Sequence, residues 1–258
     1  PFLATVVLAG GLIQHGGSDA QKKSLLPKII DGSTLMAFAH SEPKARYELN
    51  NVSTSAKKEG DGFVLNGNKA VVMHGDSADK LIVSARTSGN ARDAKGISLF
   101  IVDAKATGVT VRGYPTIDGL HAAEITLSNV KVGNDALIGK LDDALPLIEQ
   151  VTDIATAAIC AEAVGTMEAL NNATLEYLKT RRQFGVPIGK FQALQHRMVD
   201  MIVNTEQSKS MAILAAVNAQ STDAKARRQA PTSTLLRTRI PYTSLFQSGL
   251  IQHGGMGM

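Results

Sequence analysis

Hydrophobic and polar positions change their period twice along the chain of 258 residues. In residues 1–33 the apolar positions follow helical spacing and predict two helices, separated by a Gly-Gly-Ser turn at 16–18. Ser18 is a suitable N-cap residue, and Gln21 completes a capping box with it. The second helix is therefore expected over residues 19–30.

Between residues 34 and 138 the apolar positions alternate in short runs, each bounded by Gly, Asp or Asn. The glycine-rich stretch 60–62 predicts one turn, and Asn66-Gly67 is typical of a type I′ hairpin turn. Later strands are expected at 80–85, 97–102, 107–112 and 123–132. Short strands at this spacing without intervening helices predict an antiparallel β-barrel or sandwich.

From residue 139 onward the helical period returns. Apolar positions along one face from Ile148 to Leu178 predict a helix of about 35 residues, and a second helix is expected from Phe191 to about Ala219. The second helix is apolar over more than half its circumference, which indicates burial inside a bundle or an oligomer.

Residues 181–192 separate these two helices and contain two glycines and a proline, which interrupt helical structure. They predict a turn between antiparallel helices. The expected fold class is therefore α+β multidomain. It consists of α-helices (1–33), then an antiparallel β-barrel (34–138), then a C-terminal helical bundle (139–258).

Composition is that of an ordinary globular protein, with 44% hydrophobic and 19% charged residues. The net charge is +4, and the basic residues are dispersed, so no nucleic-acid-binding patch is expected. A mildly positive chain favours anionic ligands such as nucleotides. Cys160 is the single cysteine, which excludes an intrachain disulfide, and it is expected to pack in a helical core.

The apolar start of the chain, residues 1–9, is too short to span a bilayer and lacks the basic region of a signal peptide. We therefore expect no membrane span and a cytoplasmic location. The first residue is not Met and the last residues form a glycine-rich turn, so a fragment lacking both ends of a longer protein is expected.

Four motifs occur in an order that resembles the acyl-CoA dehydrogenase family. They are residues 21–23 (QKK), 41–43 (SEP), 61–69 (DGFVLNGNK) and 181–192 (RRQFGVPIGKFQ). Within the family, residues 38–43 (FAHSEP) and 71–79 (VVMHGDSAD) resemble the branch described as pimeloyl-CoA dehydrogenase small subunits.

The resemblance implies an FAD-dependent enzyme that introduces an α,β double bond into an acyl-CoA thioester. A base would remove the α-proton while hydride passes to flavin N5, and an electron-transfer flavoprotein or a similar acceptor would then take the electrons. The implied partners also include an identical or homologous subunit, in a dimer or tetramer.

The resemblance also implies residues that bind FAD. Arg181 is matched to an arginine that reaches the FAD pyrophosphate across a subunit interface, and Gln192 to a glutamine on the same loop. Phe184 would pack against the adenosine or the flavin edge. The simpler roles are a cation at a helix C-terminus for Arg181 and core packing for Phe184.

Ser41, with the backbone at Phe38 to His40, would lie along the pyrimidine edge of the flavin. Ser41 could instead cap a turn, and His40 could be a structural histidine. A second FAD-contact loop is matched to Gln252, Gly254 and Gly255, one residue shorter than in the family.

Two departures from the family pattern concern catalysis. Val71 and Met73 stand where the family has a tryptophan and a threonine beside the flavin, so one hydrogen bond would be lost. Ala155 stands where some members carry the catalytic glutamate. Asp153 is the better candidate base of the nearby carboxylates, unless the base lies beyond Met258.

Two other functions remain open. The chain could be a non-catalytic partner subunit that completes the FAD site of a heteromeric acyl-CoA dehydrogenase. It could also be a related flavin oxidase or monooxygenase.

Overall fold

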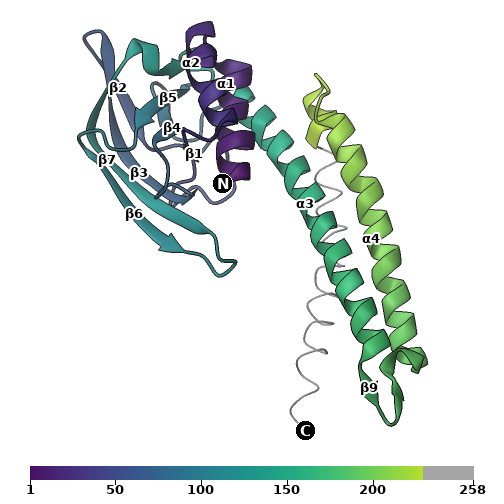
Figure 1. Ribbon diagram of the computed structural model, residues 1–258. Coiled ribbons are helices and arrows are strands. Elements are labelled where there is room, and N and C mark those ends of the chain that lie inside the picture. Colours follow the sequence, from purple (N-terminus) through teal and green to yellow (C-terminus); the bar gives the residue numbers. More distant parts are fainter. Residues whose placement is uncertain (229–258) are drawn as a thin grey trace. The chain divides into compact units, whose positions relative to one another are not determined.

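The computed structural model describes residues 1–228, which fall into two compact units (Figure 1). Unit 1 is Pro1–Thr152 and unit 2 is Asp153–Met258, of which residues 153–228 are described. Helix α3 (Leu145–Thr180) begins in unit 1 and continues into unit 2. Each unit is considered by itself.

Unit 1 opens with a π-helix, η1 (Phe2–Gly10), which runs directly into α1 (Gly11–Gly16) and is followed by α2 (Asp19–Ile30). The predicted capping box is present: the Ser18 hydroxyl accepts from the Gln21 N–H at 3.2 Å, and Gln21 Oε1 accepts from the Ser18 N–H at 2.9 Å. The Gln21 amide also donates to the carbonyls of Asp135 and Leu137, which ties α2 to the sheet.

The sheet of unit 1 has eight strands in the order β6-β7-β3-β2-β4-β5-β8, with β1 beside β4. The strands are β1 (Met36–Ala39), β2 (Ser55–Glu59), β3 (Gly62–Met73), β4 (Lys80–Arg86), β5 (Ile97–Asp103), β6 (Val109–Pro115), β7 (His121–Gly133) and β8 (Leu137–Ile138), with a short 3-10 turn η2 (Asn134–Ala136) before β8. The predicted run of short strands is therefore confirmed.

The predicted fold class, helices followed by a β-domain and a helical bundle, is confirmed, but the sheet is mixed and open rather than a closed antiparallel β-barrel. β1 and β4 are parallel, β2 meets β4 in parallel at Ser55 and Arg86, and the path from β6 to β8 does not close among the described strands. On β4, Ile82 packs into a core cluster with the helices, while Leu81 and Val83 belong to a second cluster on the other face. Helices that cover one face of the sheet remove the need for closure.

The hairpin turn predicted at Asn66-Gly67 is also absent, because β3 runs straight through these residues. The register between β3 and β7 shifts between Leu65 and Gly67, so the pair forms a β-bulge. A Cβ on Gly67 would lie 2.7 Å from Thr54 Cα, so the glycine permits close contact with the neighbouring chain. The other predicted turn, at residues 60–62, is confirmed: the chain turns at Gly60-Asp61 into β3.

In unit 2, α3 and α4 (Gln192–Asn218) pack antiparallel through buried side chains such as Met167 against Met201 and Cys160 beside Ala212. The two predicted helices and the buried cysteine are confirmed. The predicted turn between the helices contains a small hairpin, β9 (Arg182–Gln183) and β10 (Val186–Pro187), followed by η3 (Ile188–Lys190).

Apolar side chains remain exposed on both helices of unit 2. The large ones are Ile159, Leu170, Leu175, Tyr177, Val199, Ile202, Val203, Ile213, Leu214 and Val217. A helical pair with this much exposed apolar surface is typical of part of a larger bundle or assembly. Across residues 1–228, no helix is both long and apolar enough to cross a membrane.

Arg86 organises the loops at one end of the sheet in unit 1. Its buried guanidinium donates to the backbone carbonyls of five residues, at 2.7–3.4 Å: Asn50, Val52, Ala91, Asp93 and Lys95. Only a planar guanidinium supplies five donors in a fixed geometry. Arg86 therefore holds the loop at 50–52 against the loop at 91–95, together with the direct bonds from the Val52 N–H to the Ala91 carbonyl at 2.9 Å and from the Asn50 amide to the Arg92 carbonyl at 2.7 Å.

We expect Arg86→Lys to lower the free energy of unfolding by about 3 kcal/mol or more, because an ammonium has three donors and leaves buried carbonyls unpaired. Urea denaturation of the purified protein measures this change. The matched control is Arg112→Lys, since Arg112 makes an exposed ion pair with Glu124 on the same sheet. The control should change stability by less than about 0.5 kcal/mol. Equal losses in the two variants would contradict the role given to Arg86.

Candidate functional site

A cavity of about 170 Å³ lies in unit 1, where strand β1 ends. Its lining residues are Ala4, Leu8, Phe38, His40, Ser41, Leu49, Val71, Met73 and Thr152. The fold thus brings residues 38–41 together with residues 71 and 73, which the sequence pattern had matched separately to flavin contacts. Binding sites for whole small molecules usually measure about 300–1,000 Å³, so this cavity accommodates part of a ligand.

The backbone of β1 forms one wall of the cavity, and β4 pairs with only one of its two sides. At Met36, Thr5 lies on the side of the strand away from β4. The Thr5 hydroxyl accepts from the Met36 N–H at 3.2 Å and donates to the Met36 carbonyl at 2.8 Å. Backbone groups alternate in direction along a strand, so those of Phe38 also face away from β4. An N–H and a C=O are thereby directed to the side of β1 that β4 does not cover.

A bulge in β3 forms the opposite wall. The register between β3 and β7 shifts between Lys69 and Val72, and the Ala70 N–H donates to the Ser41 carbonyl at 2.9 Å. Val71 lines the cavity with 60% of its surface exposed and a φ of +51°, which a β-branched residue rarely adopts. Strained backbone of this kind is concentrated at functional sites.

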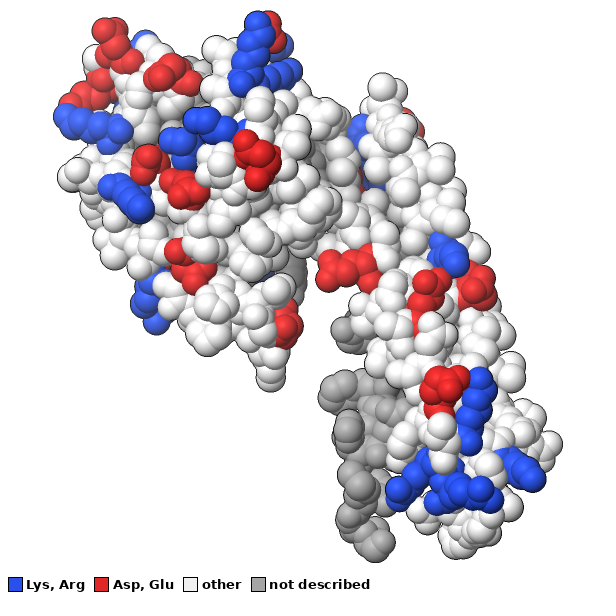
Figure 2. Space-filling model, viewed as in Figure 1, with Lys and Arg blue, Asp and Glu red and all other residues white. Residues whose placement is uncertain are grey.

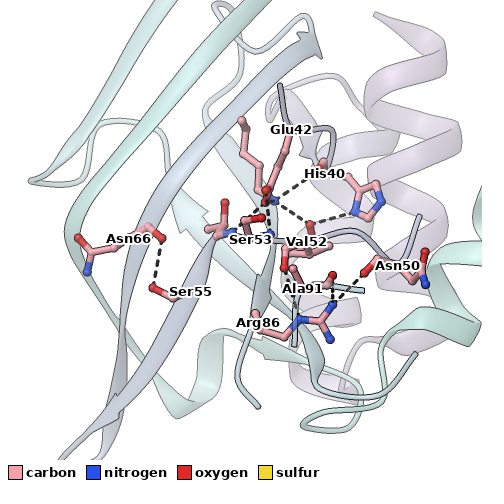
Figure 3. Close-up of polar contacts among 12 residues, drawn as sticks. His40, Glu42, Asn50, Val52, Ser53, Ser55, Asn66, Arg86 and Ala91 are labelled. Atoms are coloured by element: carbon pink, nitrogen blue, oxygen red, sulfur yellow. Dashed lines mark hydrogen bonds and ion pairs between the residues drawn. The ribbon is translucent and has the colours of Figure 1, made fainter. Parts of the chain in front are cut away.

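Behind these walls, Lys69 is completely buried, and its ammonium donates to three acceptors. Figure 3 shows two of the residues that accept from it, His40 and Glu42. The acceptors are Glu42 Oε1 at 2.7 Å, Ser84 Oγ at 3.0 Å and the His40 carbonyl at 3.2 Å. Burial lowers the pKa of Lys69 to about 8, although the neighbouring Glu42 favours the charged form. For Glu42, burial is the largest influence and opposes ionisation, but the charge and hydrogen bond of Lys69 and the backbone N–H donors of Thr54 and Ser53 together outweigh it, so the pKa is lowered.

His40 is a neutral residue in this setting. Burial lowers its pKa to about 3, and the positive charge of Lys69 acts in the same direction. Its Nδ1 lies 2.9 Å from Ser84 Oγ, and its ring stacks on Phe38 with 5.2 Å between the ring centres. His40 therefore contributes an imidazole wall to the cavity rather than a cation.

The lining is suited to the edge of a planar heteroaromatic group with alternating hydrogen-bond donors and acceptors. Phe38 offers backbone groups of both kinds, Ser41 is exposed and carries a hydroxyl, and the remaining lining is mainly apolar. The pyrimidine edge of a flavin has this pattern and fits these residues. Phe38, His40 and Ser41 all line this cavity.

We expect His40 to make the stability of unit 1 depend on pH. The unfolded chain takes up a proton at His40 below about pH 6.5 and the folded chain does not until about pH 3, so stability is full above pH 6.5 and falls as the pH is lowered. The expected loss is about 1.4 kcal/mol per pH unit below pH 6.5. Urea denaturation at pH 7.5 and pH 5.5 measures it.

His40→Gln should remove about 1.4 kcal/mol from the difference between the two pH values. The exposed His15, in the same unit, provides the control: His15→Gln should keep the wild-type dependence. An unchanged pH dependence in His40→Gln would refute the neutral buried state.

The matched residues of unit 2 lie on the hairpin between α3 and α4. Arg181 and Gln192 are exposed, and Phe184 is 90% exposed, with its ring edge-on to Phe191 at 6.2 Å. Arg182 donates to the Gly185 carbonyl at 3.2 Å, so its guanidinium is hydrogen-bonded within the hairpin itself.

The hairpin end of unit 2 is basic (Figure 2). Exposed cations there are Arg181, Arg182, Lys190 and Arg197, and no acidic residue occurs between positions 177 and 199; the neighbouring Lys179 is paired with Glu176 at 2.8 Å. Such a cluster attracts an anion such as a pyrophosphate. Within it, Arg181 presents a guanidinium group and Phe184 presents an exposed aromatic ring to a ligand.

Asp153 lies beside two arginines in unit 2. Its Oδ2 is 3.6 Å from Arg227 Nε and 3.8 Å from Arg228 Nε, and the side chain is 13% exposed. These neighbours favour an ion-paired structural role for Asp153. Gln252, Gly254 and Gly255 lie outside the described residues.

Sequence reasoning missed the residues behind the cavity. Glu42 and Lys69 belong to two of the motifs, yet no role follows from the motifs alone. The strand pattern did contain a signal, because Lys69 falls in β3 among buried apolar positions such as Phe63 and Leu65. Among residues 1–228, no group of His, Cys, Asp or Glu side chains could hold a metal ion.

Comparison with known proteins places the chain in a family. The model of the acyl-CoA dehydrogenase middle domain matches residues 37–130, and that of the acyl-CoA dehydrogenase C-terminal domain matches residues 145–258. The chain belongs to the acyl-CoA dehydrogenase family, and the resemblance seen in the sequence is confirmed.

Individual relatives cover most of this chain. A 3-(aryl)acrylate reductase of Clostridium sporogenes is 34% identical over 78% of this chain and 54% of its own length. Subunit CarC of the caffeyl-CoA reductase-Etf complex of Acetobacterium woodii is 29% identical over 81% of this chain and 56% of its own. A solved FAD-dependent dehydrogenase has a TM-score of 0.90 at 28% identity, covering 99% of this chain and 68% of its own. The chain spans about half the length of the curated relatives it matches.

Proposed function

We propose that this chain is part of an FAD-dependent acyl-CoA dehydrogenase that acts on the α,β bond of an acyl-CoA thioester. A flavin bound at the cavity would accept the hydride released from that bond. An electron-transfer flavoprotein is the proposed acceptor of the electrons, as suggested by the Etf complex to which the Acetobacterium woodii relative belongs. The assembly would be a dimer or tetramer of identical or homologous subunits.

The observation that carries this proposal is that Phe38, His40, Ser41, Val71 and Met73 line the same cavity. These residues come from two motifs and lie 30 to 35 positions apart in the sequence, and both motifs were matched independently to flavin contacts. Family membership and the related FAD-dependent dehydrogenase support FAD as the form of the cofactor.

Residues of this chain would bind the FAD cofactor and orient its flavin ring. Phe38 and Ser41 would hold the pyrimidine edge through backbone and hydroxyl groups, while Val71 and Met73 would exclude water from one side of the ring. Arg181 and Phe184, on the exposed hairpin, would bind the pyrophosphate and adenosine of a cofactor held by a second subunit.

To test this function, the full-length protein is purified, loaded with FAD and mixed with saturated acyl-CoA thioesters. We expect a yellow protein whose flavin absorbance bleaches with a suitable acyl-CoA. A correctly assembled protein that remains colourless after FAD addition would rule the function out.

Substitutions at Met73 test whether FAD binds in this cavity. Met73→Thr restores the hydroxyl of the family pattern, so it should bind FAD about fivefold more tightly than Met73→Val, which has the same shape without the hydroxyl. Equal affinity of these two variants would mean that position 73 does not contact the flavin.

The alternative is a non-catalytic partner subunit, and the environment of Asp153 favours it. The Asp153 carboxylate lies within 3.6–3.8 Å of two guanidinium groups. To act as the base it would have to give up these ion pairs and reach the α-proton of the substrate. As a partner subunit, the chain would complete an FAD site whose base lies on another chain.

Asp153→Asn distinguishes these functions. If Asp153 is the base, turnover of the complete assembly with acyl-CoA should fall at least about a hundredfold, because general-base catalysis contributes about 10²–10⁴-fold. The control is Asp200→Asn, on the exposed surface of α4, which should retain full turnover. Full activity in Asp153→Asn would exclude Asp153 as the base, and would favour a partner subunit only if no acidic residue beyond Met258 serves instead.

A further inference from the structure

The buried ammonium of Lys69 lies behind the cavity, and no proposed flavin contact accounts for it. It has three N–H donors, and all three have acceptors: the Glu42 carboxylate, the Ser84 hydroxyl and the His40 carbonyl. The side chain is fully buried and that of Glu42 is 7% exposed. A charge in such a position is tolerated only when it is paired and hydrogen-bonded.

These bonds connect both walls of the cavity. Lys69 holds the His40 carbonyl, and the next residue of its strand, Ala70, holds the Ser41 carbonyl. The bulge then presents Val71 to the cavity, which His40 and Ser41 line from the other side. A shift of Lys69 would therefore displace both walls at once.

We propose that Lys69, held in place by Glu42, is a positioning residue that fixes the His40–Ser41 peptide and the tautomer of His40, and thereby sets the affinity of the cavity for a flavin. The effect on affinity rests on the proposed function, whereas the effect on the tautomer follows from this chain alone.

The tautomer follows from counting protons. Lys69 has no lone pair, so the Ser84 hydroxyl must accept from it. Among the contacts of the described residues, the remaining partner for the Ser84 proton is His40 Nδ1 at 2.9 Å. Since the buried ring is neutral, its own proton is then carried by Nε2.

The peptide is affected through its carbonyl. A carbonyl that accepts from an ammonium is polarised, which makes the N–H of the same peptide a stronger donor. That N–H belongs to Ser41, at the rim of the cavity. Lys69 thus acts on ligand binding without touching the ligand.

A purely structural ion pair would behave differently. When both charges of such a pair are neutralised together, stability is often retained, because no unpaired buried charge remains. In Lys69→Met/Glu42→Gln the Gln carbonyl still accepts a backbone N–H, as Glu42 does from Ser53 and Thr54. The positioning role predicts that this variant folds and yet loses ligand affinity.

The experiment uses the full-length protein with histidine labelled by ¹⁵N, before and after FAD is added. In wild type we expect the nitrogen shifts of His40 to show a neutral ring protonated on Nε2, with the signal assigned by His40→Gln. In Lys69→Met/Glu42→Gln we expect a mixture of tautomers and FAD binding at least tenfold weaker. Lys131→Met/Glu59→Gln removes an exposed pair of the same residue types from the same sheet and should change neither quantity.

A wild-type His40 protonated on Nδ1 would overturn the proposal, and so would wild-type FAD affinity in a folded Lys69→Met/Glu42→Gln variant. If wild type binds no FAD, the proposed function fails, but the tautomer measured in the same samples still decides the role of Lys69.

Discussion

The geometry of unit 1 depends on the burial of one ammonium group. Water is the best solvent for a charge, so Lys69 can be fully buried only if protein groups replace its hydration on every N–H. Those groups come from strand β4, from the end of β1 and from the segment that carries Glu42. Each must approach to within hydrogen-bonding distance, and the cavity is enclosed by the segments that this requirement draws together.

Buried charged side chains near Lys69 also pair with backbone groups of the neighbouring loops. Glu42 uses its remaining acceptor capacity on the N–H groups of Ser53 and Thr54, at 2.8 and 3.0 Å, and so fixes the chain just before β2. Arg86, on β4, then satisfies the carbonyls of the adjoining loops (Figure 3). The long connection between β1 and β2 has little regular structure, yet its backbone groups are paired with buried charged side chains instead.

Unit 2 is held by a different kind of interaction. Its two helices meet through small and flexible side chains, including Ala157, Ala215 and the methionine pair Met167 and Met201. Asn171 and Thr205 add one buried hydrogen bond at 2.9 Å. Because apolar residues remain on the outer faces, this unit is expected to gain stability from further packing, whereas unit 1 carries two extensive cores of its own.

The sequence by itself determined what depends on local periodicity and on motifs. The capped helix Asp19–Ile30, the 36-residue helix α3 and the position of most strands follow from spacing and capping, which act between near neighbours. The motifs also indicated the family and the residues Phe38 to Ser41. Only the tertiary structure decided the parallel pairing of β1 with β4, because alternation specifies the face of a strand but not its neighbour. It also decided that Asn66-Gly67 forms a bulge, since pairing with β7 continues past it, and that Lys69 lies inside, where its charge has partners distant in the sequence.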